Sequence, residues 1–132
     1  MTPREKLISL YKELHELTEP VCANRDGDGC RAPRSCCDPI VCEQMADHAK
    51  NHWDVIFTHT GHPRFPLMGP DGCVAEPHLR PICTMHVCCI NGFGFKPGDD
   101  EWTEHYYELR HQIEAIEWEL WNQQEMEALG IL

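Results

Sequence analysis

Residues 30–42, CRAPRSCCDPIVC, carry four of the nine cysteines of this 132-residue chain. A second stretch, residues 72–89, reads GCVAEPHLRPICTMHVCC and carries four more. The ninth is Cys22, so all cysteines lie between Cys22 and Cys89 and none lies in either terminal segment. Because closely spaced thiols on one segment and more thiols on a distant one are typical of metal sites, we expect the two stretches to fold together around a metal centre.

The predicted ligands are thiols on turn-rich segments. Zinc takes four ligands in a tetrahedron, with about 2.3 Å to each sulfur, and iron–sulfur clusters commonly take four thiolates. The principal candidates are Cys30, Cys36, Cys37, Cys73 and Cys83, and a second set comprises Cys22, Cys88 and His86. Neighbouring side chains usually point to different sides, so we do not expect Cys36 and Cys37 to bind the same metal ion.

The occupant that we predict is an iron–sulfur cluster, [4Fe–4S], because the cysteines are abundant and occur on loops that also carry arginines. Zinc is the alternative. Disulfides or unliganded buried thiols are a third possibility, and Cys42, inside a predicted helix, is expected to be a small core residue.

The compartment follows from what the sequence lacks. It contains no apolar run near the roughly 20 residues that span a bilayer, and the first residues, MTPREK, do not resemble a signal peptide. We therefore expect a cytoplasmic protein. In a reducing cytosol, dense cysteines indicate metal binding or catalysis rather than a disulfide framework.

The formal net charge is −11, and the acidity is concentrated at one end. From Asp99 onward there are ten Asp and Glu side chains against one arginine. Binding to a nucleic-acid backbone needs a basic face, and none is visible, so we expect neither nucleic-acid nor membrane binding.

Two amphipathic segments frame the cysteine-rich region. The first segment, residues 1–20, begins with a predicted Thr2 cap. Its apolar side chains recur at helical spacing: Leu7, Leu10, Leu14, Leu17 and Val21. We expect the helix to end at Glu19-Pro20, because the residue before a proline disfavours the helical conformation. Residues 99–130 carry a matching stripe: Trp102, Tyr106, Leu109, Ile113, Ile116 and Leu120. The matching stripes predict an antiparallel helix pair.

A middle helix is predicted over about residues 38–56, with Val41, Met45, His48 or Ala49, His52 and Ile56 on its buried face. The fold class is therefore mainly α: antiparallel terminal helices and a middle helix packed on an irregular cysteine-rich metal-binding core. We expect a single domain, residues 1–132, divided into a helix (1–20), a cysteine-rich metal-binding region (22–98) and a long acidic helix (99–130).

The end of the long helix is the predicted contact with another protein chain. Trp118 and Trp121 lie near the end of its apolar stripe, beyond the reach of the shorter first helix. They are either core residues or a partner-binding surface.

The cysteine pattern resembles the family of zinc- or iron-chelating cysteine-cluster proteins. The matching features are Cys30, the Cys36-Cys37 pair followed by a helix, Gly72-Cys73, and Arg80-Pro81 with Cys83 shortly after. The resemblance covers roughly residues 30–90 and implies metal binding rather than a particular activity. Cys22, Cys42, Cys88 and Cys89 are additional to this pattern and permit a second site.

The histidines do not form a recognisable catalytic pattern. His48 and His52 are four residues apart on one predicted helix, a spacing that suits metal ligands. We nevertheless expect each histidine to be an ordinary surface or loop residue. No HExxH motif is present, and no residue is marked as a nucleophile. Three hypotheses follow: a cluster-binding protein with a mainly structural centre, a redox carrier or enzyme using the cluster, and a zinc-stabilised protein-interaction adaptor.

Overall fold

The computed structural model describes residues 1–23, 39–69, 72–85, 96 and 98–130. The described elements are four helices, a 3₁₀ helix and two short strands: α1 (Pro3–Ala23), α2 (Pro39–Trp53), β1 (Met68–Gly69), β2 (Gly72–Cys73), η1 (Pro77–Leu79), α3 (Pro81–Met85) and α4 (Asp100–Ala128). The protein is mainly helical, as the sequence predicted. None of the described helices combines the length and apolar content of a bilayer span.

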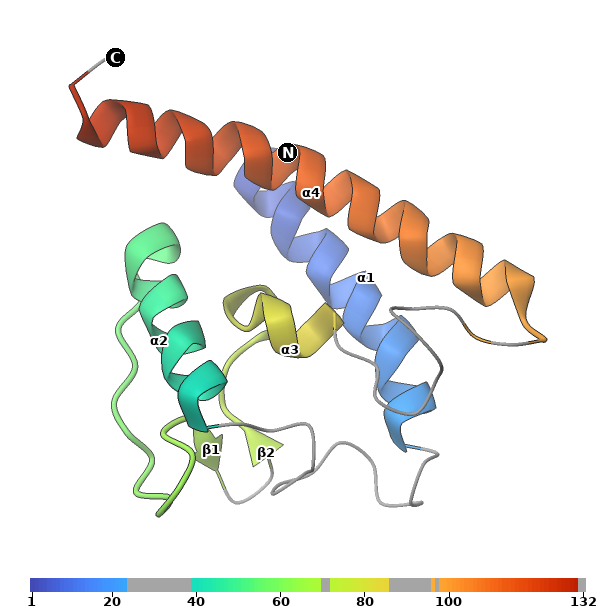
Figure 1. The fold of residues 1–132 in the computed structure, drawn as a ribbon, viewed down its shortest axis with the longest axis horizontal. Coiled ribbons are helices and arrows are strands. Elements are labelled where there is room, and N and C mark those ends of the chain that lie inside the picture. Colours follow the sequence, from blue (N-terminus) through green and yellow to red (C-terminus); the bar gives the residue numbers. More distant parts are fainter. Residues whose placement is uncertain (24–38, 70–71, 86–95, 97, 131–132) are drawn as a thin grey trace.

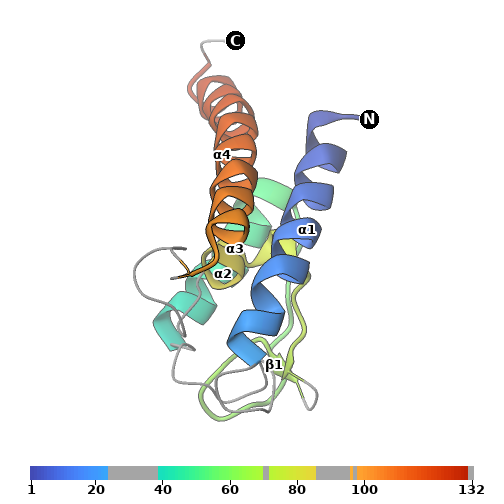
Figure 2. The same cartoon turned by 90° about the vertical axis from the view of Figure 1, so that its right-hand side faces the viewer.

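In Figure 1, α2, α3 and the β1–β2 hairpin lie beneath α4 and beside α1. Figure 2 shows α1 and α4 side by side. The Trp102 indole donates a hydrogen bond to the carbonyl of Leu17, 3.2 Å away, near the end of α1 and the start of α4. The Tyr11 hydroxyl, in the middle of α1, donates to Glu117 in the second half of α4 over 2.7 Å. The pair is therefore antiparallel, which confirms the prediction from the matching stripes.

The main core lies between these two helices. It is composed of fully or almost fully buried side chains: Leu7, Leu10, Tyr11 and Leu14 from α1, and Tyr106, Leu109 and Ile113 from α4. Their spacing of three and four residues places them on one face of each helix. A second core lies between α2 and the segment that follows it, and comprises Met45, Ala49, Leu67, Ala75 and Leu79.

The helix starts are capped as their sequences predict. The Thr2 hydroxyl accepts a hydrogen bond from the Glu5 amide and donates to the Glu5 carboxylate, each over 3.1 Å. The Asp99 carboxylate accepts from the Trp102 amide over 3.1 Å, and together with Lys96 this bond lowers the pKa of Asp99. Gly130, with φ 76°, follows the last turn of α4, as expected for a helix stop.

The predicted end of the first helix at Glu19-Pro20 is wrong, because α1 contains Pro20 and continues to Ala23. A proline lacks the N–H that would bond to the carbonyl of Glu16, which removes one hydrogen bond from the last turns. Tertiary bonds fix the turn before it: the Leu17 carbonyl accepts from Trp102 and the Thr18 hydroxyl donates to the carbonyl of Thr84 over 3.3 Å. These contacts hold the backbone helical despite the missing bond.

The predicted extent of the middle helix is also wrong at its end. Helix α2 ends at Trp53, and Asp54 adopts a left-handed conformation with φ 56°, which turns the chain away from the helix axis. Ile56 is consequently 76% exposed rather than buried. Met45 and Ala49 are buried as predicted, whereas Val41, His48 and His52 are half-buried.

The stretch 58–70 is rich in Gly, Pro and His, which predicts a loop throughout. In the structure, Met68–Gly69 instead forms β1 and pairs antiparallel with Gly72–Cys73. The hairpin matters here because it positions Cys73. Residues 87–95, for which the sequence allows a short strand or hairpin, lie outside the described part of the chain, as does Asp38, the predicted cap of the middle helix.

Candidate functional site

Residues 72–85 carry both of the predicted metal ligands whose side chains the structure describes. Cys73 is the last residue of β2, and Cys83 lies in the middle of α3. Between them the chain passes through the 3₁₀ helix η1. The two thiols therefore belong to one continuous segment, which we call the 72–85 segment.

Hydrogen bonds fold the 72–85 segment back on itself. The Arg80 side chain donates from Nε to the carbonyl of Ala75 over 2.9 Å, and the Thr84 hydroxyl donates to the carbonyl of Pro77 over 2.8 Å. Pro81 begins α3, a position where its missing N–H costs nothing. The arginine and proline that precede Cys83 in the cysteine pattern thus have a structural role, since they fix the path of the chain between the two cysteines.

The segment is anchored by its other side chains. Ala75, His78, Leu79, Pro81 and Thr84 are buried. His78 packs edge-on against Trp53, with ring centroids 4.8 Å apart, and burial lowers its pKa although Glu76 opposes the shift. A protonated imidazole is therefore disfavoured at this position.

The two ends of the segment are less buried than its middle: Val74 is 50% exposed and Ile82 is 52% exposed. Cys73 and Cys83 are both exposed. Free cysteine is among the most buried residue types and usually behaves as a small apolar side chain. Exposure of both cysteines shows that their side chains do not belong to either core.

The end of α1 lies against the same segment. The buried hydrogen bond from Thr18 to the carbonyl of Thr84 joins the two, and Thr84 directly follows Cys83. Cys22 lies in the last turn of α1, four residues after Thr18, although its side chain is outside the described part. The backbone of a third predicted ligand therefore lies about one helical turn beyond this junction.

The remaining predicted ligands, Cys30, Cys36, Cys37, Cys88 and His86, all lie outside the described residues. Within the described ranges, no three His, Cys, Asp or Glu side chains form a group that could hold a metal ion. The cysteine-rich metal core is therefore not shown. Cys42, by contrast, is half-buried and packs against the second core, in agreement with its predicted place in the core.

His48 and His52 have ligand-like spacing but take part in an aromatic cluster. The two rings are 4.7 Å apart, and the His48 ring lies edge-on to Trp121 at 6.0 Å. Burial, and then the neighbouring His52, lower the pKa of His48 to about 4. The i, i+4 spacing that suggests a metal pair in the sequence therefore serves helix packing here.

Arg4 completes this cluster, and sequence reasoning missed it. Its guanidinium lies 5.1 Å from the Trp53 ring centre and 5.5 Å from that of Trp121, and it donates to the carbonyl of His52 over 2.7 Å. A cation in the first turn of a helix is usually a solvated residue, so nothing in the sequence marked it.

The two tryptophans predicted to bind a partner differ in their surroundings. Trp121 is half-buried against the main core and donates from Nε1 to Glu117 over 3.0 Å. Trp118 is 72% exposed. His52 of α2 and Arg4 of α1 both lie over Trp121, so only Trp118 matches the expectation of an uncovered aromatic side chain.

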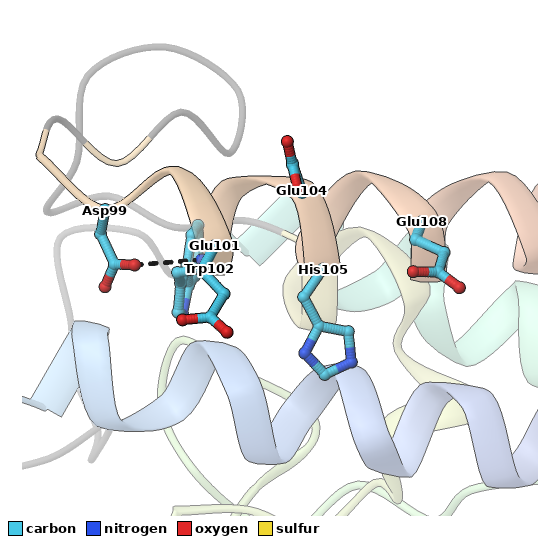
Figure 3. Close-up of a pocket in the computed structure, with 6 residues that line it drawn as sticks. All are labelled: Asp99, Glu101, Trp102, Glu104, His105 and Glu108. Atoms are coloured by element: carbon cyan, nitrogen blue, oxygen red, sulfur yellow. Dashed lines mark hydrogen bonds between the residues drawn. The ribbon is translucent and has the colours of Figure 1, made fainter.

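A hollow of about 510 Å³ lies at the start of α4 and is mostly acidic, lined by Asp99, Glu101, Trp102, Glu104, His105 and Glu108. Its charged side chains do not converge, since Glu104 and His105 project to opposite sides of α4 (Figure 3). His105 instead reaches Glu13 of α1 at 3.4 Å. We interpret this surface as a solvated helix face.

Comparisons of the chain with protein-family models, with curated proteins and with solved structures gave no match. The likeness to cysteine-cluster proteins therefore stays a prediction, and the function is argued from the residues.

Proposed function

We propose that this protein is a small cysteine-ligated metalloprotein of the cytoplasm that binds an iron–sulfur cluster, [4Fe–4S], mainly for structural purposes. The observation that carries the proposal is the exposure of Cys73 and Cys83 near the two ends of a segment whose path is fixed by hydrogen bonds and by buried side chains between them. An inert structural cysteine is normally buried. A ligand must instead project from its backbone toward a site shared with other segments.

The ligand set combines these two residues with cysteines from the first cysteine-rich stretch, Cys30 and either Cys36 or Cys37. Cys22, at the end of α1, is the candidate replacement, with Cys88 and His86 as further donors. When bound, the cluster would tie the stretch after α1 to the 72–85 segment, and metal binding would be coupled to folding of the ligand-bearing segments. The chain's own contribution is to hold Cys73 and Cys83 on a fixed path through Arg80 and Thr84.

Zinc is the alternative occupant, because a tetrahedral zinc site takes the same four thiolates. With zinc, the protein would be a metal-stabilised adaptor rather than a cluster protein. A redox function is favoured only if the cluster cycles reversibly between oxidation states. The described carboxylate–histidine contacts, such as Glu13 with His105, are pairs, and among the described residues none is joined by a third such side chain into a group that could hold a metal ion.

The test is anaerobic purification followed by absorption spectroscopy and analysis of iron, sulfide and zinc. Broad absorbance near about 400 nm with iron and sulfide supports the cluster, and a colourless protein with one zinc per chain supports the alternative. Cys73→Ser and Cys83→Ser should each lower the metal content, whereas Cys42→Ser is the matched control and should retain it. A chain without either metal, or with these cysteines in disulfides when freshly isolated, would disprove the proposal.

A further inference from the structure

Trp118 differs from the other three tryptophans of the chain. Trp53, Trp102 and Trp121 are half-buried and pack against the main core, whereas Trp118 is 72% exposed. An indole offers a large apolar surface whose removal from water is favourable. Trp118 therefore presents an exposed apolar surface and has no packing role in the main core.

Trp118 lies in a shallow groove of about 340 Å³ on α4. The groove is lined by Glu114, Glu117, Trp118, Trp121, Asn122 and Glu125, and we call it the Trp118 groove. Its residues follow one another at intervals of three and one, so they form a single stripe along one face of the helix. The groove thus combines two indoles with three carboxylates.

The negative charge of this face is only partly balanced by the chain itself. Glu114 pairs with Arg110 at 3.3 Å, and Glu117 accepts from Tyr11 and Trp121. Glu125 has no ion-pair partner within the described residues. After Arg110, α4 carries five glutamates and no lysine or arginine. A ligand that fits the groove therefore brings positive charge.

The same aromatic cluster already binds a guanidinium from within the chain. Arg4 lies over Trp121 at 5.5 Å and over Trp53 at 5.1 Å. Trp is the strongest of the aromatic side chains for this cation–π contact, and arginine is its more frequent partner. The exposed Trp118 offers the same kind of surface to an arginine from elsewhere.

We propose that the Trp118 groove is a docking site for an arginine-bearing segment of another protein chain. One guanidinium lies over the Trp118 indole, and it or a neighbouring basic side chain pairs with Glu125. The proposal uses only residues of α4 and does not depend on whether the cysteines bind a metal.

Three other occupants fit less well. A purely apolar helix would leave the carboxylates of the groove without partners on desolvation. A second copy of the chain would bring its own acidic α4 and a net charge of −11, so like charges would meet. A nucleic acid would present phosphates to glutamates.

The test is fluorescence anisotropy with the full-length protein and a labelled Arg-Gly-Ser repeat peptide, at low and physiological ionic strength. We expect binding that weakens with salt and that Trp118→Ala weakens by about tenfold. Glu125→Gln should weaken it by about threefold. The matched control is Glu104→Gln, which makes the same change in charge at an exposed site near the other end of α4 and should change little.

The proposal is overturned if the arginine peptide does not bind, or if Glu104→Gln weakens binding as much as Glu125→Gln, which would indicate unspecific attraction to net charge. It is also overturned if sedimentation shows a dimer that Trp118→Ala dissociates, because the occupant is then a second copy. Circular dichroism verifies that each variant is folded. If Trp118→Ala loses helix content, the peptide affinities of Glu125→Gln and Glu104→Gln test the proposal instead, and it stands only if Glu125→Gln binds more weakly.

Discussion

The imidazole of His52 stacks on the indole of Trp121, with ring centroids 4.4 Å apart and an interplanar angle of 29°. Its Nδ1 lies 2.9 Å from the side-chain oxygen of Gln124. This contact joins the end of α2 to the far half of α4, beyond the described contacts between α4 and the middle of α1 (Figure 1). It explains why Trp121 is covered while Trp118, three residues earlier, is not.

Trp121→Ala and Trp118→Ala should therefore differ in their effect on stability. We expect Trp121→Ala to lower the free energy of unfolding by about 2–4 kcal/mol, because it removes the ring against which α2 packs. Trp118→Ala should change it by no more than about 0.5 kcal/mol, as is usual for an exposed side chain. Urea unfolding followed by circular dichroism measures both. Equal losses for the two variants would contradict the arrangement of α2 on α4.

Acidification should destabilise the protein through His48. Its pKa falls from the ordinary 6.5 to about 4 in the folded state, so the unfolded chain binds more protons between these values. Stability is then full above pH 6.5 and falls as the pH drops toward 4. Allowing for solvent screening at this half-buried site, we expect a loss of about 1–2 kcal/mol.

The measurement is the free energy of unfolding at several pH values, for the native chain and for His48→Gln. The substitution should remove part of the slope between pH 6.5 and 4. His111→Gln is the control, since His111 is exposed on α4 and should leave the slope as it is. If the free energy of unfolding of His48→Gln falls as steeply with pH as that of the native chain, other groups, such as the buried His78, cause the pH dependence.

The sequence predicted the α1–α4 pair well because each helix repeats its apolar residues at helical spacing, and local periodicity suffices to identify the buried face. Ile113 and Leu14 are fully buried as expected. The failures arise where contacts distant in the sequence override local preferences. Thr84 and Trp102 hold the turn before Pro20, and neither contact can be read from residues 17–23.

The candidate site was predicted in part. Cys73 and Cys83 as metal ligands remain a prediction from the cysteine spacing, and the structure adds that both are exposed and that Arg80 fixes the chain between them. No spacing rule could have shown that His48 and His52 pack against Trp121, because that contact depends on how α2 lies on α4. Two histidines four residues apart on a helix have the same sequence pattern whether they bind a metal or pack against a neighbouring helix.

Glu117 links two helices through one carboxylate. Oε1 accepts from the Tyr11 hydroxyl at 2.7 Å, and Oε2 accepts from the Trp121 indole at 3.0 Å. Burial, together with this carboxylate, raises the pKa of Tyr11, so its hydroxyl stays protonated and donates. Hydrogen bonds to charged acceptors are the stronger class.

A double-mutant cycle with Tyr11→Phe and Glu117→Gln should therefore give a coupling energy of about 1 kcal/mol or more. Urea unfolding of the two single variants and the double variant provides it. The cycle of Tyr11→Phe with Glu127→Gln is the control, because Glu127 lies at the exposed end of α4. Coupling as large in the control would show that the effect is not the Tyr11–Glu117 bond.

Arg80→Gln should weaken metal binding without removing a thiol. The substitution removes the Nε donor that bonds to Ala75, so the path between Cys73 and Cys83 becomes less fixed. Loss of a group that orients metal ligands commonly lowers the metal affinity about tenfold. We therefore expect the metal to transfer to a chelator about tenfold faster. Arg64→Gln is the control, since Arg64 is exposed and lies over Phe65. Equal chelator half-times for the two variants, with circular dichroism unchanged, would contradict the role given to Arg80, whereas loss in Arg80→Gln alone would support it.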